Sequence, residues 1–330
     1  EQPEQQQQQQ QQPCDGDVEE SVLDEIVAAN PHCAQLRAAP VRPFLAAALR
    51  PRAVGDIDRF LSPAWPRMRY CKRPDADRSS CHWGQLKLLE SELKCLTDFL
   101  TSADAGTAAA AADIAAASAL VVYVGAAPGR HVPSLARRFP SCRFELYDPA
   151  EFDPKLVEFA ESEEGVGRIR LVRGFFDEAA AASLAERLRS HQAENGEGPL
   201  VFFSDIRTAD EQLMTPAEVE QSICRDMERQ RSWVEALRPA VALLKFRLPW
   251  GPGRTQYLRG RLLVQAFPPC TSTESRLLVH AADGLADATY DHEEYEERLM
   301  HHNTVGRSQL HDLGVPVAGL PGLDRCYDCA

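Results

Sequence analysis

The sequence lacks the features that would place it in a membrane or among disulfide-bonded secreted proteins. Apolar residues make up 44% of its 330 positions, yet no run reaches the roughly 18–20 positions of a membrane helix. The ten cysteines show no framework spacing, which predicts reduced thiols in an intracellular protein. Cys326 and Cys329 form a lone CxxC without the second pair that a zinc site needs. We therefore expect no membrane association, no metal site and a cytoplasmic location.

Two common nucleotide-binding fingerprints are also missing. The stretch VVYVGAAPGRHV at 121–132 runs from an apolar strand into a glycine turn, but GAAPGR lacks the middle glycine of GxGxxG. No GxxxxGK[ST] run exists anywhere in the chain. These absences weaken the case for a dinucleotide or a triphosphate. A strand–GxxPG–helix unit remains, in which Gly125 and Gly129 let the backbone pass close to a ligand.

An acid at the end of the next predicted strand narrows the choice of ligand. Asp148 follows Gly125 by 23 positions, and a carboxylate at that place can accept hydrogen bonds from a ribose diol. The strand, the turn of small residues and the acid together favour S-adenosylmethionine. The alternative is a plain tight turn in an enzyme of another class.

Strand and helix patterns alternate from position 120 onward. Continuous apolar strands separated by helices predict a mostly parallel sheet with helices on both faces, an α/β fold whose ligands bind at the carboxyl ends of the strands. Predicted strands lie at 120–125, 143–148, 168–174, 199–205, 240–247 and 273–280, and predicted helices at 84–100, 131–138, 151–162, 177–193, 216–236 and 291–302.

Composition divides the rest of the chain. Residues 1–20 are rich in glutamine and acids and predict a disordered tail. Residues 21–66 hold short helical patterns broken by prolines and predict a helical appendage. The main domain is expected over 67–307, followed by a C-terminal tail over 308–330.

The net charge of −13 argues against a nucleic-acid partner, but its distribution is uneven. Residues 1–36 carry eight acids and residues 283–297 carry seven, both without Lys or Arg. Residues 245–261 instead hold five basic residues and no acid. Because charges are screened beyond roughly 8–10 Å at physiological salt, such a strip can attract a phosphate backbone on an acidic protein. The candidate RNA contacts are Arg247, Arg254 and Arg259.

Four ionisable residues stand out as a possible reaction centre. Asp205 ends a predicted strand, and Lys245 interrupts another that is otherwise apolar. A lysine there must reach the edge of the sheet or pair with an acid. Glu274 opens a further strand, and Lys87 lies on the helix at 84–100. Taken singly, Asp205 could cap a helix, and Glu274 and Lys87 could be ordinary surface residues.

Together these four residues suit methylation of a ribose hydroxyl. The ribose oxygen attacks a sulfonium methyl in line and loses a proton, which a neutral lysine could accept. Free lysine has a pKa of about 10.4, and burial or a neighbouring cation lowers it. Lys87 could supply that second cation, while Asp205 and Glu274 orient the two lysines.

Several short blocks then occur in one order over about residues 67–307: GQLKLL (84–89), VVYVGAAPGRH (121–131), SDIR (204–207), LKFRLPW (244–250) and ESRLL (274–278). They resemble the poxvirus cap-specific mRNA 2′-O-methyltransferases, a family that also serves as the small, processivity subunit of the viral poly(A) polymerase. The resemblance implies a Rossmann-like methyltransferase that uses S-adenosylmethionine to methylate the first transcribed nucleotide of capped mRNA. It also implies the polymerase catalytic subunit as a partner, and the host cytoplasm or the virion as the location.

The resemblance also implies roles for individual residues. Lys87, Asp205, Lys245 and Glu274 match the reactive tetrad of the family, with Lys245 as the base that Asp205 activates. The methyl-donor site maps onto Gln85, Tyr123, Gly125, Ala127, Pro128, Gly129, His131, Asp148, Phe176 and Asp205.

The family clamps an N7-methylated guanine between two aromatic rings and meets its edge with acids. Trp250 matches one ring and Glu296 one acid, and Tyr70 is the nearest candidate for the second ring. The second acid, expected two positions after the ring, falls on Pro252. The glutamine-rich start, the alanine-rich segment at 101–118 and the short chain after Arg307 also depart from the family pattern.

Three other functions remain open from the sequence. The same chemistry could act on uncapped structured RNA, or the chain could be a non-catalytic RNA-binding processivity subunit. A small-molecule methyltransferase is the third, although the basic strip argues against it.

Overall fold

The computed structural model describes residues 59–71, 84–100, 118–195, 198–210 and 212–308. The predicted tail at 1–20, nearly all of the predicted appendage, the alanine-rich segment and the CxxC pair lie outside the described residues. Among the described residues, no helix combines the length and apolarity needed to cross a bilayer.

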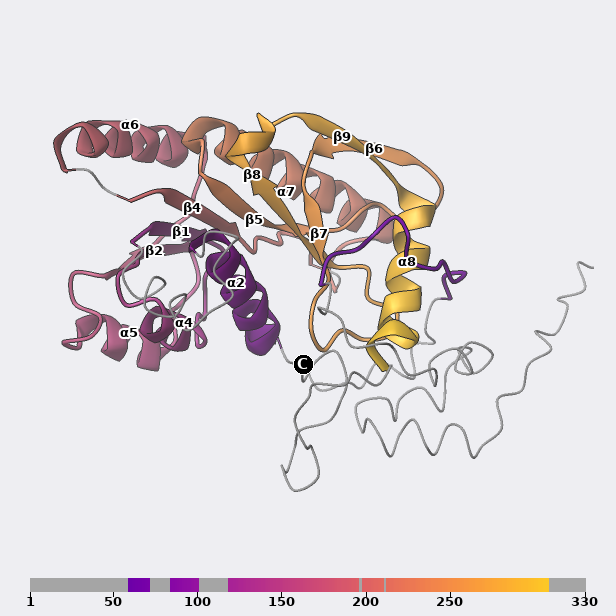
Figure 1. Ribbon diagram of the computed structural model, residues 1–330, viewed down its shortest axis with the longest axis horizontal. Helices are drawn as coiled ribbons and strands as arrows, with labels where there is room; N and C mark the ends of the chain where they lie inside the picture. The colour runs from indigo at the N-terminus through magenta and orange to yellow at the C-terminus, as the bar shows by residue number, and fades with distance from the viewer. Residues whose placement is uncertain (1–58, 72–83, 101–117, 196–197, 211, 309–330) are drawn as a thin grey trace, which may run out of the picture.

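A seven-stranded sheet forms the centre of the molecule, in the order β3-β2-β1-β4-β5-β8-β7 (Figure 1). The first five strands of that order run parallel, whereas β8 is antiparallel to β5 and β7 is antiparallel to β8. The predicted mostly parallel sheet is therefore confirmed. Its strands are β1 (Leu120–Val124), β2 (Arg143–Asp148), β3 (Ile169–Arg173), β4 (Leu200–Ser204), β5 (Val241–Phe246), β7 (Arg261–Leu263) and β8 (Ser275–His280).

Helices cover both faces of this sheet, as the apolar strands require. One face packs against α2 (Gly84–Leu100), α4 (Val132–Arg138) and α5 (Pro154–Glu161), and the other against α6 (Glu178–Asn195) and α7 (Pro216–Leu237). Side chains alternate between the faces, so Phe202 joins the core under α7 and Phe203 the core under α2. This doubly covered, mostly parallel sheet makes the fold Rossmann-like.

Local signals set where the long helix α7 begins and ends. Thr215 accepts the Glu218 N–H, and the Glu218 carboxylate accepts the Thr215 N–H in return, which is a capping box. Pro216 occupies the first turn, where its missing N–H costs nothing. Arg238 ends the helix in a left-handed conformation with φ of 50°.

Three short strands were not predicted. β6 (Arg254–Leu258) and β9 (Asp287–Asp291) pair as a separate antiparallel ribbon, and β7 adds the edge strand of the main sheet. Phe60 forms an isolated bridge to Leu263 of β7. These strands have only three to five residues, and none is joined to its partner by a short hairpin turn, so no local turn signal predicts them. The predicted helix at 291–302 appears as α8 (His292–Thr304).

Candidate functional site

The order of the strands creates a crevice beside β1. The chain winds outward from β1 through β2 to β3 and then returns to β4 on the other side of β1. Ligands of such sheets bind where the order reverses, outside the carboxyl ends of the strands. A cavity of about 760 Å³ lies there, within the usual size of a small-molecule site. Five of the ten predicted donor residues line it: Gly125, Ala127, Asp148, Phe176 and Asp205.

Glycine is required at the start of the turn. Gly125 has φ of +80°, and a Cβ there would lie 2.9 Å from the Asp205 carbonyl carbon and from the Ile206 nitrogen. The end of β4 therefore passes directly against this glycine. Asp148 holds the same turn from β2, because its Oδ2 accepts the Ala127 N–H at 2.9 Å.

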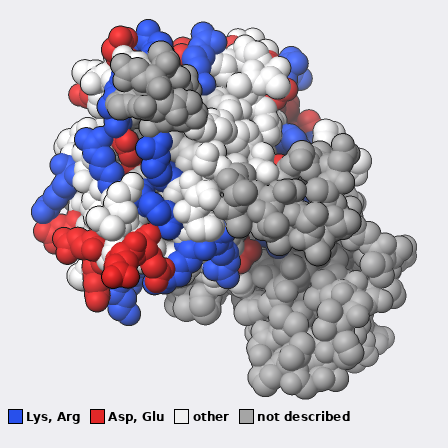
Figure 2. Space-filling model, turned by 60° about the vertical axis from the view of Figure 1, so that its left-hand side comes forward, with Lys and Arg blue, Asp and Glu red and all other residues white. Residues whose placement is uncertain are grey.

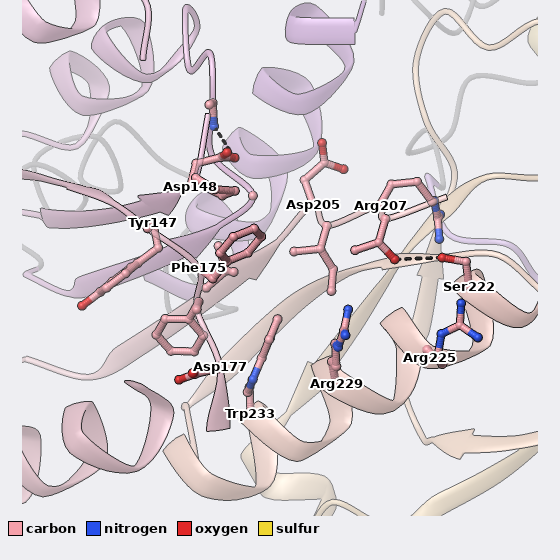
Figure 3. A pocket seen from close by; sticks show the side chains of 18 of the residues that line it. Tyr147, Asp148, Phe175, Asp177, Asp205, Arg207, Ser222, Arg225, Arg229 and Trp233 are labelled. Atoms are coloured by element: carbon pink, nitrogen blue, oxygen red, sulfur yellow. Dashed lines mark hydrogen bonds between the residues drawn. The ribbon is translucent and has the colours of Figure 1, made fainter. Parts of the chain in front are cut away.

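Aromatic rings and arginines line opposite parts of the cavity. Figure 3 shows Tyr147 and Phe175 on one side, Arg225 and Arg229 of α7 on the other, and Asp205 between them. The ring of Phe176, a buried residue, also lines the cavity. It contacts the Tyr147 ring edge-on at 4.9 Å and the Trp233 ring edge-on at 5.2 Å between ring centres. The cavity thus has an apolar part and a cationic part.

The other five predicted donor residues do not line this cavity. Tyr123 is buried on the α2 face of the sheet, where its ring contacts Phe203. Gln85 and His131 hydrogen-bond to each other beneath the turn. Gly129 has φ of +68°, and a Cβ there would meet the Leu156 side chain at 2.6 Å. Pro128 lies within the turn but is not one of the residues that line the cavity.

Three strands bring most of the predicted tetrad together. Lys245 Nζ on β5 lies 3.1 Å from Asp205 Oδ1 after β4, and 3.6 Å from Glu274 Oε2 before β8. The sheet makes this possible because β5 lies between β4 and β8. Burial opposes the ionised form of both carboxylates, yet the neighbouring cations Lys245 and Arg276 hold the pKa of each below its usual value.

Lys87 joins the group from helix α2. Burial lowers its pKa, and the nearby cations Arg276 and Lys245 lower it further, against the opposing effect of Glu274. From its own segment, the sequence indicated only that Lys87 lies on an amphipathic helix, not that this helix packs beside the tetrad. The sheet and α2 therefore place all four members of the tetrad within electrostatic range of one another.

Sequence reasoning missed Arg276, the residue most deeply buried in this cluster. Its Nη1 lies 2.7 Å from Asp205 Oδ1, and its Nη2 3.8 Å from Glu274 Oε1. It also stands directly opposite Lys245 in the register of β5 and β8. A signal was present, because Glu274 and Arg276 are two positions apart and so share one face of an otherwise apolar strand. Arg207 adds another cation, with Nη2 3.6 Å from Glu274 Oε2.

The predicted aromatic pair also meets. The rings of Tyr70 and Trp250 are 5.0 Å apart at an interplanar angle of 49°, and Trp250 is 43% exposed. The Arg247 guanidinium lies 5.0 Å from the Trp250 ring centre. Burial, with help from Glu296, raises the pKa of Tyr70 to about 12.

Two acids lie beside these rings. Glu296 is buried and its Oε1 has no hydrogen-bond partner among the described residues, and burial raises its pKa. Sequence reasoning missed Glu220 of α7. This residue pairs with Arg247, and its carboxylate accepts the backbone N–H of Trp250 at 3.4 Å. No sequence signal linked Glu220 to Trp250, because they meet only through the packing of α7 beside the end of β5.

The predicted basic strip faces acids. Arg254 Nε lies 3.4 Å from Asp291 Oδ2, and Arg259 donates to the Asp287 carbonyl oxygen at 3.4 Å. The reason is the pairing of β6 with β9, which lays part of the acidic segment at 283–297 along the strip. The arginines that face the cavity, Arg207, Arg225 and Arg229, come from elsewhere in the chain.

Known proteins resemble this chain over the region just described. The sequence profile of the family described as "Poly A polymerase regulatory subunit" matches residues 69–312. The chain belongs to this family. The resemblance predicted from the sequence blocks is thereby confirmed.

Curated relatives of the chain come from poxviruses. It is 26% identical over 245 residues to the cap-specific mRNA (nucleoside-2′-O-)-methyltransferase of Myxoma virus (strain Lausanne), covering 69% of this chain and 63% of that protein. It is 25% identical over 241 residues to the protein of the same name from Fowlpox virus (strain NVSL), covering 69% and 68%. The chain thus spans less than two thirds of the length of the Myxoma protein.

Among solved structures, bluetongue virus VP4, described as a multifunctional RNA-capping production line, aligns with a TM-score of 0.44 at 13% identity. That alignment covers 73% of this chain and 33% of VP4.

Proposed function

We propose that this chain methylates the ribose 2′-hydroxyl of the first transcribed nucleotide of capped mRNA, with S-adenosylmethionine as methyl donor. One observation carries the proposal: Asp205 lines the cavity and also lies 3.1 Å from Lys245 Nζ. This shared carboxylate puts a donor site beside a lysine that can act on an incoming hydroxyl. The names of the Myxoma and Fowlpox relatives support the same activity.

The cavity residues suit this donor. Gly125 has no side chain, so a ligand can approach the backbone closely there. Asp148 accepts the Ala127 N–H with one oxygen, and its carboxylate has further lone pairs that can accept hydrogen bonds from ribose hydroxyls. Phe176 and Trp233 offer apolar surface for an adenine ring. When bound, the donor supplies an electrophilic methyl group on a sulfonium sulfur.

The tetrad handles the proton of the ribose hydroxyl. Lys245, held by Asp205 and Glu274, is the proposed base. Burial lowers the pKa of Lys87 and so favours its neutral form, which makes it the second candidate for the base. Arg276 and Arg207 add positive charge around the two carboxylates, which suits a substrate that carries phosphates.

Tyr70 and Trp250 form the proposed cap site, and their rings, whose centres lie 5.0 Å apart, must separate before a guanine can lie between them. N7-methylated guanine is cationic, so each ring that stacks on it adds a favourable term of about 0.5–2 kcal/mol. The Arg247 guanidinium near Trp250 supports the view that this ring accepts a cationic partner. Glu296 and Glu220 are the proposed acids for the guanine edge, with Glu220 in place of the acid that would fall on Pro252.

The polymerase catalytic subunit is the proposed protein partner, because the family is described as its regulatory subunit. The poxvirus relatives favour a viral setting in the host cytoplasm or the virion. The methyltransferase domain is proposed to span 67–307.

Transfer of a tritiated methyl group to three RNAs tests the proposed function. We expect methylation of N7-methyl-capped RNA, weaker methylation of RNA with an unmethylated cap, and none of uncapped RNA. Equal labelling of capped and uncapped RNA would instead indicate an enzyme for structured RNA, and no labelling of any RNA would indicate a non-catalytic subunit.

A further inference from the structure

Three polar side chains fasten the donor turn to helix α2. His131 follows the turn, and its Nε2 lies 2.9 Å from Glu92 Oε2, while its Nδ1 lies 3.0 Å from Gln85 Oε1. Both acceptors belong to α2. The side chains of His131 and Glu92 are each only 2% exposed, so the contact is built into the interior.

Hydrogen-bond chemistry fixes the orientation of this group. The Arg130 backbone N–H, which can only donate, lies 2.8 Å from Gln85 Oε1, so the facing atom must be the oxygen. The same oxygen therefore accepts from His131 Nδ1–H. Nε2 lies 3.1 and 2.9 Å from the two Glu92 carboxylate oxygens, so each ring nitrogen has an oxygen of α2 within hydrogen-bond distance. The amide NH₂ group of Gln85 is left to donate elsewhere.

The position of this buried His131–Glu92 pair is what suggests a role. A buried pair is costly to desolvate, and apolar side chains could join a helix to a turn with less cost. Here α2 carries Lys87 as well as Gln85 and Glu92, and the turn carries Gly125 and Ala127 of the donor cavity. The reactive lysine and the donor site are thus connected through His131.

The connection continues toward the tetrad. Burial, with help from the neighbouring Glu92, raises the pKa of Tyr123 of β1. A void of about 10 Å³, roughly the size of one water, is lined by Glu92, Tyr123, Asp205 and Arg276. Ser204 also lines this void, and its buried Oγ has no hydrogen-bond partner among the described residues.

We propose that Glu92 and His131 are a positioning pair that holds Gln85 and Lys87 in register with the donor turn. The pair touches no reacting atom, and it acts through the two α2 side chains. This inference rests on the proposed use of the cavity for a methyl donor. It assigns an indirect role to Gln85 and His131, which the sequence placed in the donor site itself.

Glu92→Gln tests the pair because it removes the charge and keeps the shape. We expect the Kd for S-adenosylhomocysteine, measured by calorimetry, to rise about tenfold through misplacement of the turn, with the KM for capped RNA within about twofold. Glu90→Gln is the matched control, since Glu90 lies on the same helix in a more exposed pair with Arg59 at 3.3 Å. It should change neither quantity.

Two substitutions of His131 separate positioning from stability. Asparagine places an amide nitrogen near Nδ1 and keeps the Gln85 contact, whereas glutamine places one near Nε2 and keeps the Glu92 contact. We expect His131→Gln, which keeps the Glu92 contact, to bind the donor analogue more tightly than His131→Asn at equal folded fraction.

Equal donor affinity for these two variants, or an unchanged Kd in folded Glu92→Gln, would overturn the inference. These results differ from a failure of the proposed function, in which the wild-type protein itself would not bind the donor analogue.

Discussion

At the scale of residues, the site depends on charges that cannot stand alone. Lys245 and Arg276 face each other across neighbouring strands, and like charges in that position repel. Asp205 and Glu274 resolve the conflict by pairing with both cations. Each charge in the cluster therefore depends on the others, and single substitutions should have large effects.

Arginine substitutions distinguish the two lysines. Arginine keeps the charge but does not give up its proton at accessible pH. If Lys245 is the base, Lys245→Arg should lower kcat by at least about 100-fold, while Lys87→Arg should keep a larger share of activity. The measurement is single-turnover methyl transfer at saturating donor, and the reverse order would make Lys87 the base.

Glu274→Gln should change how stability depends on pH. The pKa of Glu274 is depressed in the folded state, so its contribution is complete above its unfolded pKa of about 4.3 and is lost as the pH falls. We expect the variant to lose about 3 kcal/mol of unfolding free energy at pH 7, and the gap to wild type to narrow below about pH 5. Urea unfolding from pH 3 to 7 measures this, and a gap that is constant with pH would contradict the assignment.

Glu220→Gln tests the proposed cap acid. We expect binding of an N7-methylated cap analogue to weaken by roughly tenfold, which corresponds to about 1.4 kcal/mol, with little change for the unmethylated analogue. Quenching of tryptophan fluorescence reports the binding. Glu228→Gln, an exposed acid further along α7, is the control and should bind like wild type.

At the scale of elements, contacts from three other parts of the fold hold the turn between β1 and α4 in place. It is held by Asp148 from β2, by the end of β4 against Gly125, and by α2 through His131. Three elements far apart in the sequence therefore define one short turn. A change within it should affect both folding and the donor site.

Gly125→Ala and Gly167→Ala separate backbone strain from steric conflict. Both glycines have positive φ, so both alanines should cost about 1–2 kcal/mol. Only at Gly125 would the new Cβ meet the backbone of β4, whereas nothing lies within 4 Å of it at Gly167. We expect a further loss of about 1–3 kcal/mol and loss of donor binding for Gly125→Ala alone, measured by thermal unfolding and calorimetry. Equal behaviour of the two variants would remove the steric argument.

At the scale of the whole molecule, the acidic net charge does not produce a uniformly acidic surface. Figure 2 shows Lys and Arg side chains spread over the face that carries α5 and α6, with Asp and Glu gathered in a separate cluster. The cavity has its own cations, Arg207, Arg225 and Arg229. A polyanion that reaches the proposed site would therefore meet these three arginines despite the charge of −13.

The salt dependence of RNA binding tests which arginines contact RNA. If Arg225 and Arg229 each neutralise one phosphate, Arg225→Gln with Arg229→Gln should reduce the slope of log K against log salt by roughly 1.4–1.8. Arg254→Gln, in the strip that faces acids, should change it little. A larger change in slope for Arg254→Gln would indicate that RNA contacts the basic strip at 245–261, as the sequence predicted.

The sequence by itself determined the fold class and nearly all elements of the main sheet, and it predicted the four residues proposed as the tetrad. This was possible because apolar periodicity, a glycine turn and a charged residue inside an apolar strand are properties of single segments. The tertiary structure decided which segments meet: Tyr70 with Trp250, Arg276 with Asp205, and β6 with β9. It also put Gln85 and His131 beneath the donor turn instead of in the cavity lining. Such contacts depend on strand order, register and helix packing over long separations, which no pattern within one segment specifies.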